Sequence, residues 1–340
     1  MSSHSTYAAA GVDIEAGNRA TALMKTAVQA TFGPEVLSGV GAFGGLYSVG
    51  KLKHMESPTL VASTDGVGTK TKVAAQLKRW DTIGFDIVNH CVNDILVQGG
   101  RPLFFLDYVA SAKLDPEQIA TIVQGVAAAC KAVGCALLGG ETAEMPGVYH
   151  EGAVDLVGTV VGVVERGEII NGQRIEAGDV ILGLPSTGLH TNGFTLARQV
   201  LAGLDWREVR AELGMSVGEA LLQPHRAYLG EIGRLQEAHV DVRGLAHITG
   251  GGLIDNPPRI FPDGLGARLR RGAWPEPPIF GLIQQLGEID SLEMCHVFNM
   301  GLGMLVVVPP TDVALVQELL GEAVFVVGEM VAGEKRVEIV

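Results

Sequence analysis

Cysteine is scarce in this sequence, and no pair has the spacing of a zinc site. The 4 cysteines among the 340 residues are Cys91, Cys130, Cys135 and Cys295, and none forms a C-x-x-C pair. Structural zinc sites need such paired, closely spaced ligands. Cys130 falls in a helical pattern and Cys135 beside a strand, so we expect buried free thiols, in keeping with a reducing cytoplasm.

Positive charge and long apolar runs are lacking too. Lys and Arg number 25 against 38 Asp and Glu, and the formal net charge is −13. A surface that follows a nucleic-acid backbone needs clustered Lys and Arg, so we expect no nucleic-acid partner. No apolar run is long enough to span a bilayer, and the opening residues MSSHSTYAAAG lack the apolar core of a signal peptide. We therefore expect a cytoplasmic protein with no membrane partner.

The sequence does contain enough apolar residues for two packed domains. It is 47% hydrophobic and 19% charged, as globular proteins are, and its length suggests two domains. The polar stretch from Glu165 to Asp179 holds an Asn-Gly turn signal and predicts a boundary. We therefore divide the chain into residues 1–168 and 169–340, and we expect an α/β fold whose second half is α+β.

The stretch STDGVGTK contains the groups needed to hold a metal-bound polyphosphate. A strand-like run leads into it, so Asp65 is expected where a strand ends. Gly66 and Gly68 let the backbone turn tightly and approach a ligand, while Thr69 offers a hydroxyl and Lys70 a cation. An ordinary β-turn explains this short stretch equally well, because short glycine motifs often match by chance.

A helix predicted over Asp81–Gln98 carries a second candidate acid. Its polar side chains Asp86, His90, Asn93 and Asp94 fall near one another by helical periodicity. Such a face is usually just solvated. Asp94, however, lies late in the helix in an apolar stretch beside two glycines, so we favour it over Asp86 as a functional residue.

A third acid follows a short strand predicted over Ala136–Leu138. The residues Gly139, Gly140, Glu141 and Thr142 repeat the order of strand, glycines, acid and hydroxyl. Two such strand ends and the helix acid predict a shared metal site.

The predicted metal is Mg²⁺, with Asp65, Asp94 and Glu141 as its candidate ligands. Mg²⁺ takes carboxylates, waters and substrate phosphates rather than a complete cage of protein ligands.

Three loops are rich in glycine or polar residues. Gly39–Tyr47 is either a lid over phosphates or a plain connector. Pro185–Gly193 precedes the N-terminus of a predicted helix, and helix N-termini favour anions. His190 and Asn192 would then face the ligand. An isolated loop histidine, however, is more often a surface or packing residue. Gly250–Gly252 is either a phosphate cradle or a hinge.

Together these motifs resemble the phosphoribosylformylglycinamidine cyclo-ligases, the aminoimidazole ribonucleotide synthetases of purine biosynthesis. The matching blocks keep the family's order and span nearly the whole chain: STDGVGTK (63–70), CVNDILVQGGRPLFFLDY (91–108), GGETAEMPGVYH (139–150), STGLHTNGF (186–194), HITGGGLIDNPPRI (247–260) and FNMGLGM (298–304).

The resemblance implies an enzyme, a C–N ligase that uses MgATP to close the imidazole ring of formylglycinamidine ribonucleotide. In that family the formyl oxygen is thought to be phosphorylated, the substrate's own amidine nitrogen attacks, and phosphate leaves. Its members are homodimers whose N-terminal domains pair mixed sheets into a shared barrel and bind ATP without a P-loop. The pattern G-x-x-x-x-G-K-[ST] is absent here as well. The alternative is a catalytically silent ATP-binding dimer subunit of the same superfamily, and the intact acids and glycines argue against it.

The resemblance also implies residue roles. The catalytic residues would be Asp65, Asp94, Lys70 and His190, and the metal ligands Asp65, Asp94 and Glu141. Contacts to ATP would come from Lys25, Gly66, Gly68, Thr69, Lys70, Asn93, Gly139, Gly140, Glu141 and Thr142. Substrate contacts would come from His190, Thr191, Asn192, Gly250, Gly251 and Gly252.

The chain departs from the family at two places. Ala8 and Ala9 stand where members often have Lys and Asp, and His296 stands where many have Arg. A histidine is a shorter and weaker anion ligand than arginine at pH 7. Rival families fit less well: a selenophosphate synthetase would need a reactive cysteine near the N-terminus, whereas the first one here is Cys91.

Overall fold

The computed structural model describes residues 13–340, so Ala8 and Ala9 lie outside the described residues. The chain forms two compact units, Met1–Val92 with Pro102–Glu165, and Asn93–Arg101 with Arg166–Val340. The unit boundary at Glu165 falls within the polar stretch that predicts a domain boundary, and our division at residue 168 stays a prediction.

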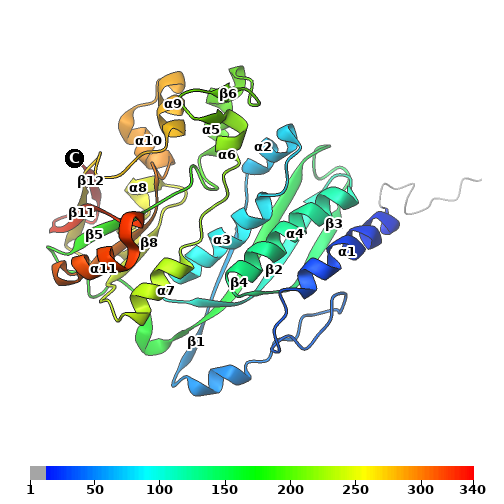
Figure 1. The fold of residues 1–340 in the computed structure, drawn as a ribbon, viewed down its shortest axis with the longest axis horizontal. Helices are drawn as coiled ribbons and strands as arrows, with labels where there is room; N and C mark the ends of the chain where they lie inside the picture. The colour runs from blue at the N-terminus through cyan, green and yellow to red at the C-terminus, as the bar shows by residue number, and fades with distance from the viewer. Residues whose placement is uncertain (1–12) are drawn as a thin grey trace, which may run out of the picture. The chain divides into compact units, whose positions relative to one another are not determined.

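The first unit is built on a four-stranded mixed sheet with helices packed on one face (Figure 1). Its elements in chain order are α1 (Ile14–Gln29), β1 (Pro58–Gly66), α2 (Lys70–Leu77), α3 (Ile83–Leu96), β2 (Arg101–Ser111), α4 (Pro116–Ala132), β3 (Ala136–Glu144) and β4 (Val154–Glu165). The end of α3 from Asn93 and the first residue of β2, Arg101, belong to the second unit. The strands lie in the order β1-β4-β2-β3, with β1 antiparallel to β4 and β2 parallel to β3.

Local signals start the helices of this unit. The Asp13 carboxylate accepts a hydrogen bond from the Ala16 amide at 3.1 Å and so caps α1. Asp115 caps α4 in the same way, with Pro116 in the first turn, as the sequence predicts. α1 packs against α4.

Strand β4 corrects one expectation. Its nearly continuous apolar sequence predicted burial on both faces, but buried and partly exposed residues alternate along most of it. Val154, Leu156, Gly158 and Val160 are buried, whereas the residues that alternate with them, Asp155, Val157 and Thr159, are only partly buried. Because β4 pairs antiparallel with β1 and helices cover only one face, the other face stays partly open.

Glycine lets α3 and α4 approach closely. A Cβ atom on Gly84 would lie 2.2 Å from the Val126 amide nitrogen and 2.4 Å from the Gly125 carbonyl carbon. Gly158 of β4 is equally confined, since a Cβ there would meet the Phe105 ring at 2.2 Å. These contacts seat α3 against both α4 and the sheet.

The second unit is an α+β domain around a six-stranded sheet. Its elements are β5 (Val180–Pro185), α5 (Phe194–Val200), β6 (Val209–Arg210), β7 (Met215–Ser216), α6 (Val217–Leu221), α7 (Leu229–Glu237), β8 (Gly244–His247), α8 (Gly252–Asp255), β9 (Leu265–Leu269), α9 (Pro278–Gly287), α10 (Ser291–Val297), β10 (Leu302–Val308), α11 (Val313–Leu320), β11 (Phe325–Ala332) and β12 (Val337–Ile339). The strand order is β12-β9-β11-β5-β10-β8, and only β12 and β9 are parallel. Every residue of β10 is buried, as expected for a strand inside the sheet.

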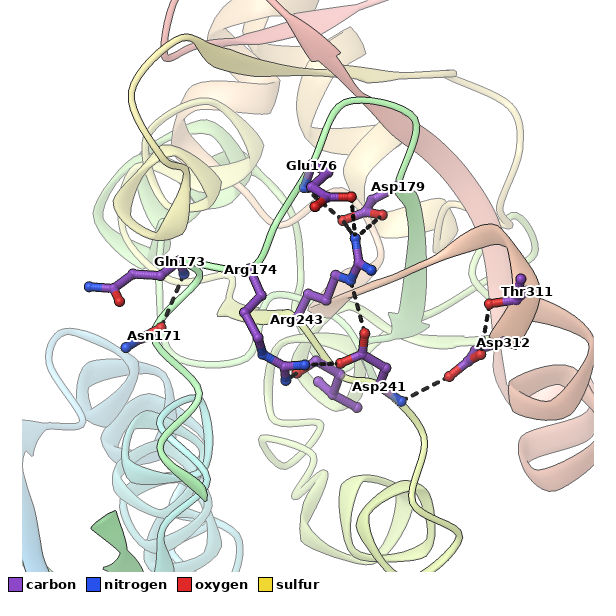
Figure 2. Close-up of polar contacts among 10 residues, drawn as sticks. Asn171, Gln173, Arg174, Glu176, Asp179, Asp241, Arg243, Thr311 and Asp312 are labelled. Atoms are coloured by element: carbon purple, nitrogen blue, oxygen red, sulfur yellow. Dashed lines mark hydrogen bonds and ion pairs between the residues drawn. The ribbon is translucent and has the colours of Figure 1, made fainter. Parts of the chain in front are cut away.

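A polar network joins the segments before β5, β8 and α11 (Figure 2). Arg243 lies at its centre: its guanidinium bonds Asp179 at 2.9 Å and Asp241 at 3.0 Å. The Asp241 amide donates to Asp312 at 2.9 Å. Burial alone would raise the pKa of Asp241, but hydrogen bonds from Arg243 and Arg174 outweigh it and lower that pKa.

Candidate functional site

Asp65 lies where the sequence predicts, at the end of β1. One carboxylate oxygen accepts the Gly66 amide at 2.6 Å, and the other lies 2.8 Å from His90 Nε2. Its side chain is 43% exposed. Gly68 has φ +69°, a left-handed conformation that lets the chain turn from β1 into α2. The carboxylate is therefore oriented by its neighbours and still open to a ligand.

Lys70 has an environment that sequence reasoning missed. Its side chain is fully buried, and its ammonium lies 2.7 Å from Asp86 Oδ1, which is also fully buried. Burial lowers the pKa of Lys70, and the charge of Asp86 opposes that effect. We expected Asp86 to be solvated on the polar face of α3, but it forms a buried ion pair with Lys70 instead. Contact between Lys70 and a triphosphate stays a prediction.

A pocket of about 650 Å³ lies within the first unit. Its size is typical of small-molecule sites. It joins three segments singled out from the sequence, namely α1, the glycine-rich loop and the Gly139–Thr142 stretch. The lining residues are Gly17, Thr21, Met24, Val28, residues 39–45, Leu106, Asp107, Val123 and residues 137–142.

Within residues 13–340, the walls of this pocket contain acids but no cation. Among its lining residues only Asp107 and Glu141 ionise, and the rest are apolar, glycine or threonine. Lys25 is exposed on α1 and does not line it. The loop is anchored at Gly45, where a Cβ atom would meet Leu138 at 2.3 Å. Its role as a lid stays a prediction.

Strand β3 is longer than predicted. It continues through Gly139, Gly140 and Glu141 to Glu144 instead of ending at Leu138. β3 pairs with β2 in parallel, and this register places Asp107 opposite Gly140. Strand β2 therefore lies along one edge of the Gly139–Thr142 stretch. The glycines are strand residues that keep one pocket wall free of side chains.

In the second unit, Asp94 begins a chain of hydrogen-bonding side chains. Its Oδ1 lies 2.8 Å from His247 Nδ1, and His247 Nε2 lies 3.0 Å from His225 Nε2. One of these facing nitrogens must carry the proton. His225 Nδ1 lies 3.3 Å from the Thr191 hydroxyl. Residues from four separate segments of the chain thus form one polar group, in which His225, His247 and Thr191 are buried and Asp94 is partly exposed.

His190 packs onto this group. It is buried, has φ +61°, and stacks on His225 with ring centroids 4.0 Å apart. The Thr187 amide donates to His190 Nε2 at 3.2 Å. A left-handed backbone is uncommon for histidine, so the surrounding structure holds His190 in place.

Asn93 is committed to protein contacts. Its amide nitrogen donates to the Arg226 carbonyl at 2.9 Å and lies 3.2 Å from His225 Nε2. Its oxygen accepts the Tyr228 amide at 3.1 Å. These bonds use both amide hydrogens, so Asn93 positions the His225 segment, and its predicted contact with ATP is not tested.

The Gly250–Gly252 loop is held by its own neighbours. Asn256 accepts the Thr249 amide at 2.7 Å and donates to the Gly250 carbonyl at 3.1 Å. A Cβ on Gly252 would lie 2.2 Å from the Cys295 carbonyl oxygen. These bonds favour a fixed loop over a hinge, and phosphate binding there stays a prediction.

Sequence reasoning missed three residues of these sites: Asp107, His225 and His247. Asp107 had one signal, since it is an acid inside the apolar run PLFFLDYVA. His247 opens the HITGGG block, but nothing in the sequence pairs it with Asp94. His296, which replaces an expected arginine, lies 2.8 Å from Asp255.

Two family descriptions match the chain. "AIR synthase related protein, N-terminal domain" matches residues 49–164, and "AIR synthase related protein, C-terminal domain" matches residues 176–340. Phosphoribosylformylglycinamidine cyclo-ligases from Desulfitobacterium hafniense (strain DSM 10664 / DCB-2) and Geobacillus thermodenitrificans are 52% and 51% identical over 328 and 333 residues. Each alignment covers 96% of this chain and 96% of the relative.

Solved structures share the fold at low identity. E. coli HypE, a hydrogenase maturation protein, has a TM-score of 0.65 at 18% identity and covers 94% of this chain and 93% of its own. Thiamine-monophosphate kinase from Stenotrophomonas maltophilia has a TM-score of 0.65 at 17% identity, and the match covers 93% of this chain and 95% of the kinase. A HypE structure in complex with ATP also has a TM-score of 0.65 at 17% identity, and the match covers 95% of this chain and 90% of that HypE chain.

Proposed function

Because this chain belongs to the phosphoribosylformylglycinamidine cyclo-ligase family, we propose that it closes the imidazole ring of formylglycinamidine ribonucleotide. The products are aminoimidazole ribonucleotide, ADP and phosphate. The observation that carries this proposal is an identity of about one half to curated cyclo-ligases over almost the full length of both chains. No observation favours a silent subunit.

The chemistry follows from the substrate. A formyl oxygen on an amide carbon is a poor leaving group, so transfer of the ATP γ-phosphoryl group turns it into phosphate. The amidine nitrogen then attacks the formyl carbon, the ring closes and phosphate leaves. The protein's task is to hold the reactants in line and to neutralise charge on the phosphoryl group.

The pocket of the first unit is the proposed site for the adenosine part of ATP. Its volume suits a nucleoside, and its apolar walls and bare β3 backbone suit a flat base. Of the residues that the structure describes, two acids and no cation line it, so the phosphates would lie outside. Glu141 lines the same pocket, and we propose that its carboxylate accepts hydrogen bonds from the ribose hydroxyls in place of binding metal.

The buried polar group of the second unit is the proposed site for the formylglycinamidine substrate. It brings His190 and Thr191 beside the Asp94–His247–His225 chain. Donors and acceptors fixed in this way can orient an amidine and move its proton without reorganising. Asn192 extends the same loop, and its oxygen lies within 3.3 Å of where a Gly250 side chain would begin.

Mg²⁺ is part of the proposal, with Asp65 of the first unit and Asp94 of the second unit each as a separate candidate ligand. Both are carboxylates at partly open positions, oriented by hydrogen bonds from His90 and His247 respectively. Oxygen ligands of this kind suit Mg²⁺, and second-shell histidines commonly orient them. When bound, the ion would neutralise charge on the transferring phosphoryl group.

A homodimer is also proposed, formed through the open face of the first sheet. Leu60 of β1 is 63% exposed, and Ala62 and Thr64 on the same side of the strand are exposed as well. Ala62 and Thr64 stand opposite Val161 and Thr159 on the same face. A second copy covering it would bury apolar side chains and shield the edge strands.

The proposed function also places the protein in the cytoplasm, where purine synthesis takes place. Its 4 cysteines are buried free thiols, which suits a reducing compartment. No helix in the part of the chain that the structure describes is long and apolar enough to cross a membrane.

One assay tests the proposed reaction. Purified protein is mixed with MgATP and formylglycinamidine ribonucleotide, and aminoimidazole ribonucleotide and ADP are followed together. We expect both products in equal amounts and only when both substrates are present. ADP without the imidazole, or neither product from a protein that still binds ATP, would refute the cyclo-ligase activity.

A further inference from the structure

Asp107 is a carboxyl group in the wall of the proposed adenosine pocket. It lies on β2 between Phe105 and Val109, which share its side of the strand and are buried. Its side chain makes no ion pair or hydrogen bond with another residue in the described range 13–340. Buried polar groups are normally hydrogen-bonded, so a half-buried carboxyl group of this kind is a candidate for a hydrogen bond with a ligand.

The neighbouring strand is shaped around this carboxyl. A Cβ atom on Gly140 would lie 2.0 Å from Asp107 Oδ1 and 2.8 Å from Asp107 Cγ. Any side chain at position 140 would therefore displace the Asp107 carboxyl. The glycine keeps the acid packed against bare backbone at the pocket wall, where a flat ligand can reach it.

The surroundings favour the neutral acid. Burial raises the pKa of Asp107 to about 7. The titratable groups that face it are the Cys130 thiol of α4, whose pKa burial raises well above its ordinary value, and the exposed Glu141 of β3 on the same pocket wall. The lining residues of α1 and of the glycine-rich loop carry no charge.

A neutral carboxyl group offers one acceptor and one donor side by side. The edge of adenine offers the complement, an amino N–H donor beside a ring-nitrogen acceptor. An ionised carboxylate offers acceptors only, so its second oxygen would face the ring-nitrogen lone pair. Adenine therefore pairs better with the protonated acid.

We propose that Asp107 is the residue that recognises the adenine base, accepting from its amino group and donating to the adjacent ring nitrogen. This inference rests on the proposed placement of ATP in the pocket. It makes Asp107 a specificity-determining residue, and it predicts that adenine binding weakens as pH rises through neutrality.

Adenosine is the probe for the test, because it lacks phosphates that titrate in this range. Calorimetry at pH 6 and pH 9 gives its dissociation constant for the wild type, Asp107→Ala and Asp107→Asn, with Asp155→Asn, another half-buried aspartate of the same sheet, as the control. We expect Asp107→Ala to weaken binding by about tenfold to a hundredfold at pH 6, since two hydrogen bonds are lost.

The conservative variant separates recognition from packing. Asparagine also offers one donor and one acceptor, so Asp107→Asn should bind within about threefold of wild type at pH 6 and lose the pH dependence. Wild type should weaken by at least about tenfold between pH 6 and pH 9. 1-Deazaadenosine lacks ring nitrogen N1 but keeps the amino group, so Asp107→Ala should weaken its binding less than it weakens adenosine binding.

Two outcomes separate the inference from the function beneath it. If Asp107→Ala and Asp107→Asn bind adenosine as the wild type does at both pH values, the assignment of Asp107 is overturned while ring closure stands. If the wild type shows no ATP-dependent ring closure and no adenosine binding, the proposed function fails and the inference fails with it.

Discussion

Individual acids in this protein have different tasks because their surroundings differ. Asp65 is half-open and held by His90, Asp86 is buried against Lys70, and Asp107 lines a pocket, where burial raises its pKa. The same carboxyl group is therefore suited to bind a metal, to fill a buried ion pair, or to meet a ligand as a neutral acid.

Replacing Asp65 with asparagine should lower turnover by at least about a hundredfold, because a neutral amide is a poor Mg²⁺ ligand. The half-open side chain carries no core packing, so the fold should persist. Steady-state kinetics and circular dichroism on the same sample check both statements. Normal turnover by a folded Asp65→Asn protein would remove Asp65 from the metal site.

The pH dependence of stability should change in Asp107→Asn. An acid whose folded pKa, about 7, exceeds its ordinary value of 3.8 binds more protons when folded, so the wild type loses stability as pH rises from about 4 to 7. The upper bound is about 4 kcal/mol, and incomplete burial reduces our expectation to roughly 1–2 kcal/mol. Asp107→Asn should therefore gain on the wild type between pH 5 and pH 8 in urea unfolding, and a constant difference would contradict the raised pKa.

At the scale of elements, the position of α3 depends on a glycine contact. Gly84→Ala should destabilise the protein by roughly 2–4 kcal/mol, because the new methyl group would meet α4 backbone at 2.2 Å. The control is Gly281→Ala in α9, where nothing lies within 4 Å of the added atom. That change should stabilise by roughly 0.5–1 kcal/mol through helix propensity. Equal melting temperatures for the two variants would contradict the close packing.

The Arg243 network is the corresponding element contact in the second unit (Figure 2). Arg243→Ala should destabilise by roughly 2–4 kcal/mol at pH 7, because Asp179, with its side chain 3% exposed, would keep a buried charge without its partner. Arg174→Ala is the control, since that side chain is 65% exposed and its ion pair should contribute under about 1 kcal/mol.

Acid should weaken the effect of Arg243→Ala. The lowered pKa of Asp241 means that its contribution is present above its unfolded pKa and disappears as pH falls through the folded value. Urea unfolding at pH 7 and pH 3 measures both differences. An effect of equal size at the two pH values would show that the network's charges do not contribute.

For the whole molecule, the proposed dimer gives the open sheet face a partner. Leu60→Arg should convert the protein to a monomer in light scattering, because a two-fold interface would bury the new charge twice. Leu292→Arg in α10 is the matched control, since Leu292 is 60% exposed in the other unit. Dimers in both variants would place the interface elsewhere, and monomers in the wild type would refute the dimer.

The sequence by itself determined the order of elements and the family. Capping residues, periodicity and glycines act over a few neighbours, so the helix α3 and the end of β1 at Asp65 could be predicted and are present. The motif blocks identify the family because their order and spacing can be read directly from the sequence.

Only the tertiary structure decided which side chains meet. Lys70 pairs with Asp86, Asp107 faces Gly140, and Asp94 reaches His247 across 153 positions of sequence. Local pattern cannot supply such partners, since periodicity gives the face of an element but not what packs against it. The prediction that both faces of β4 are buried was wrong for the same reason. An apolar strand has the same sequence pattern whether or not a helix covers its second face.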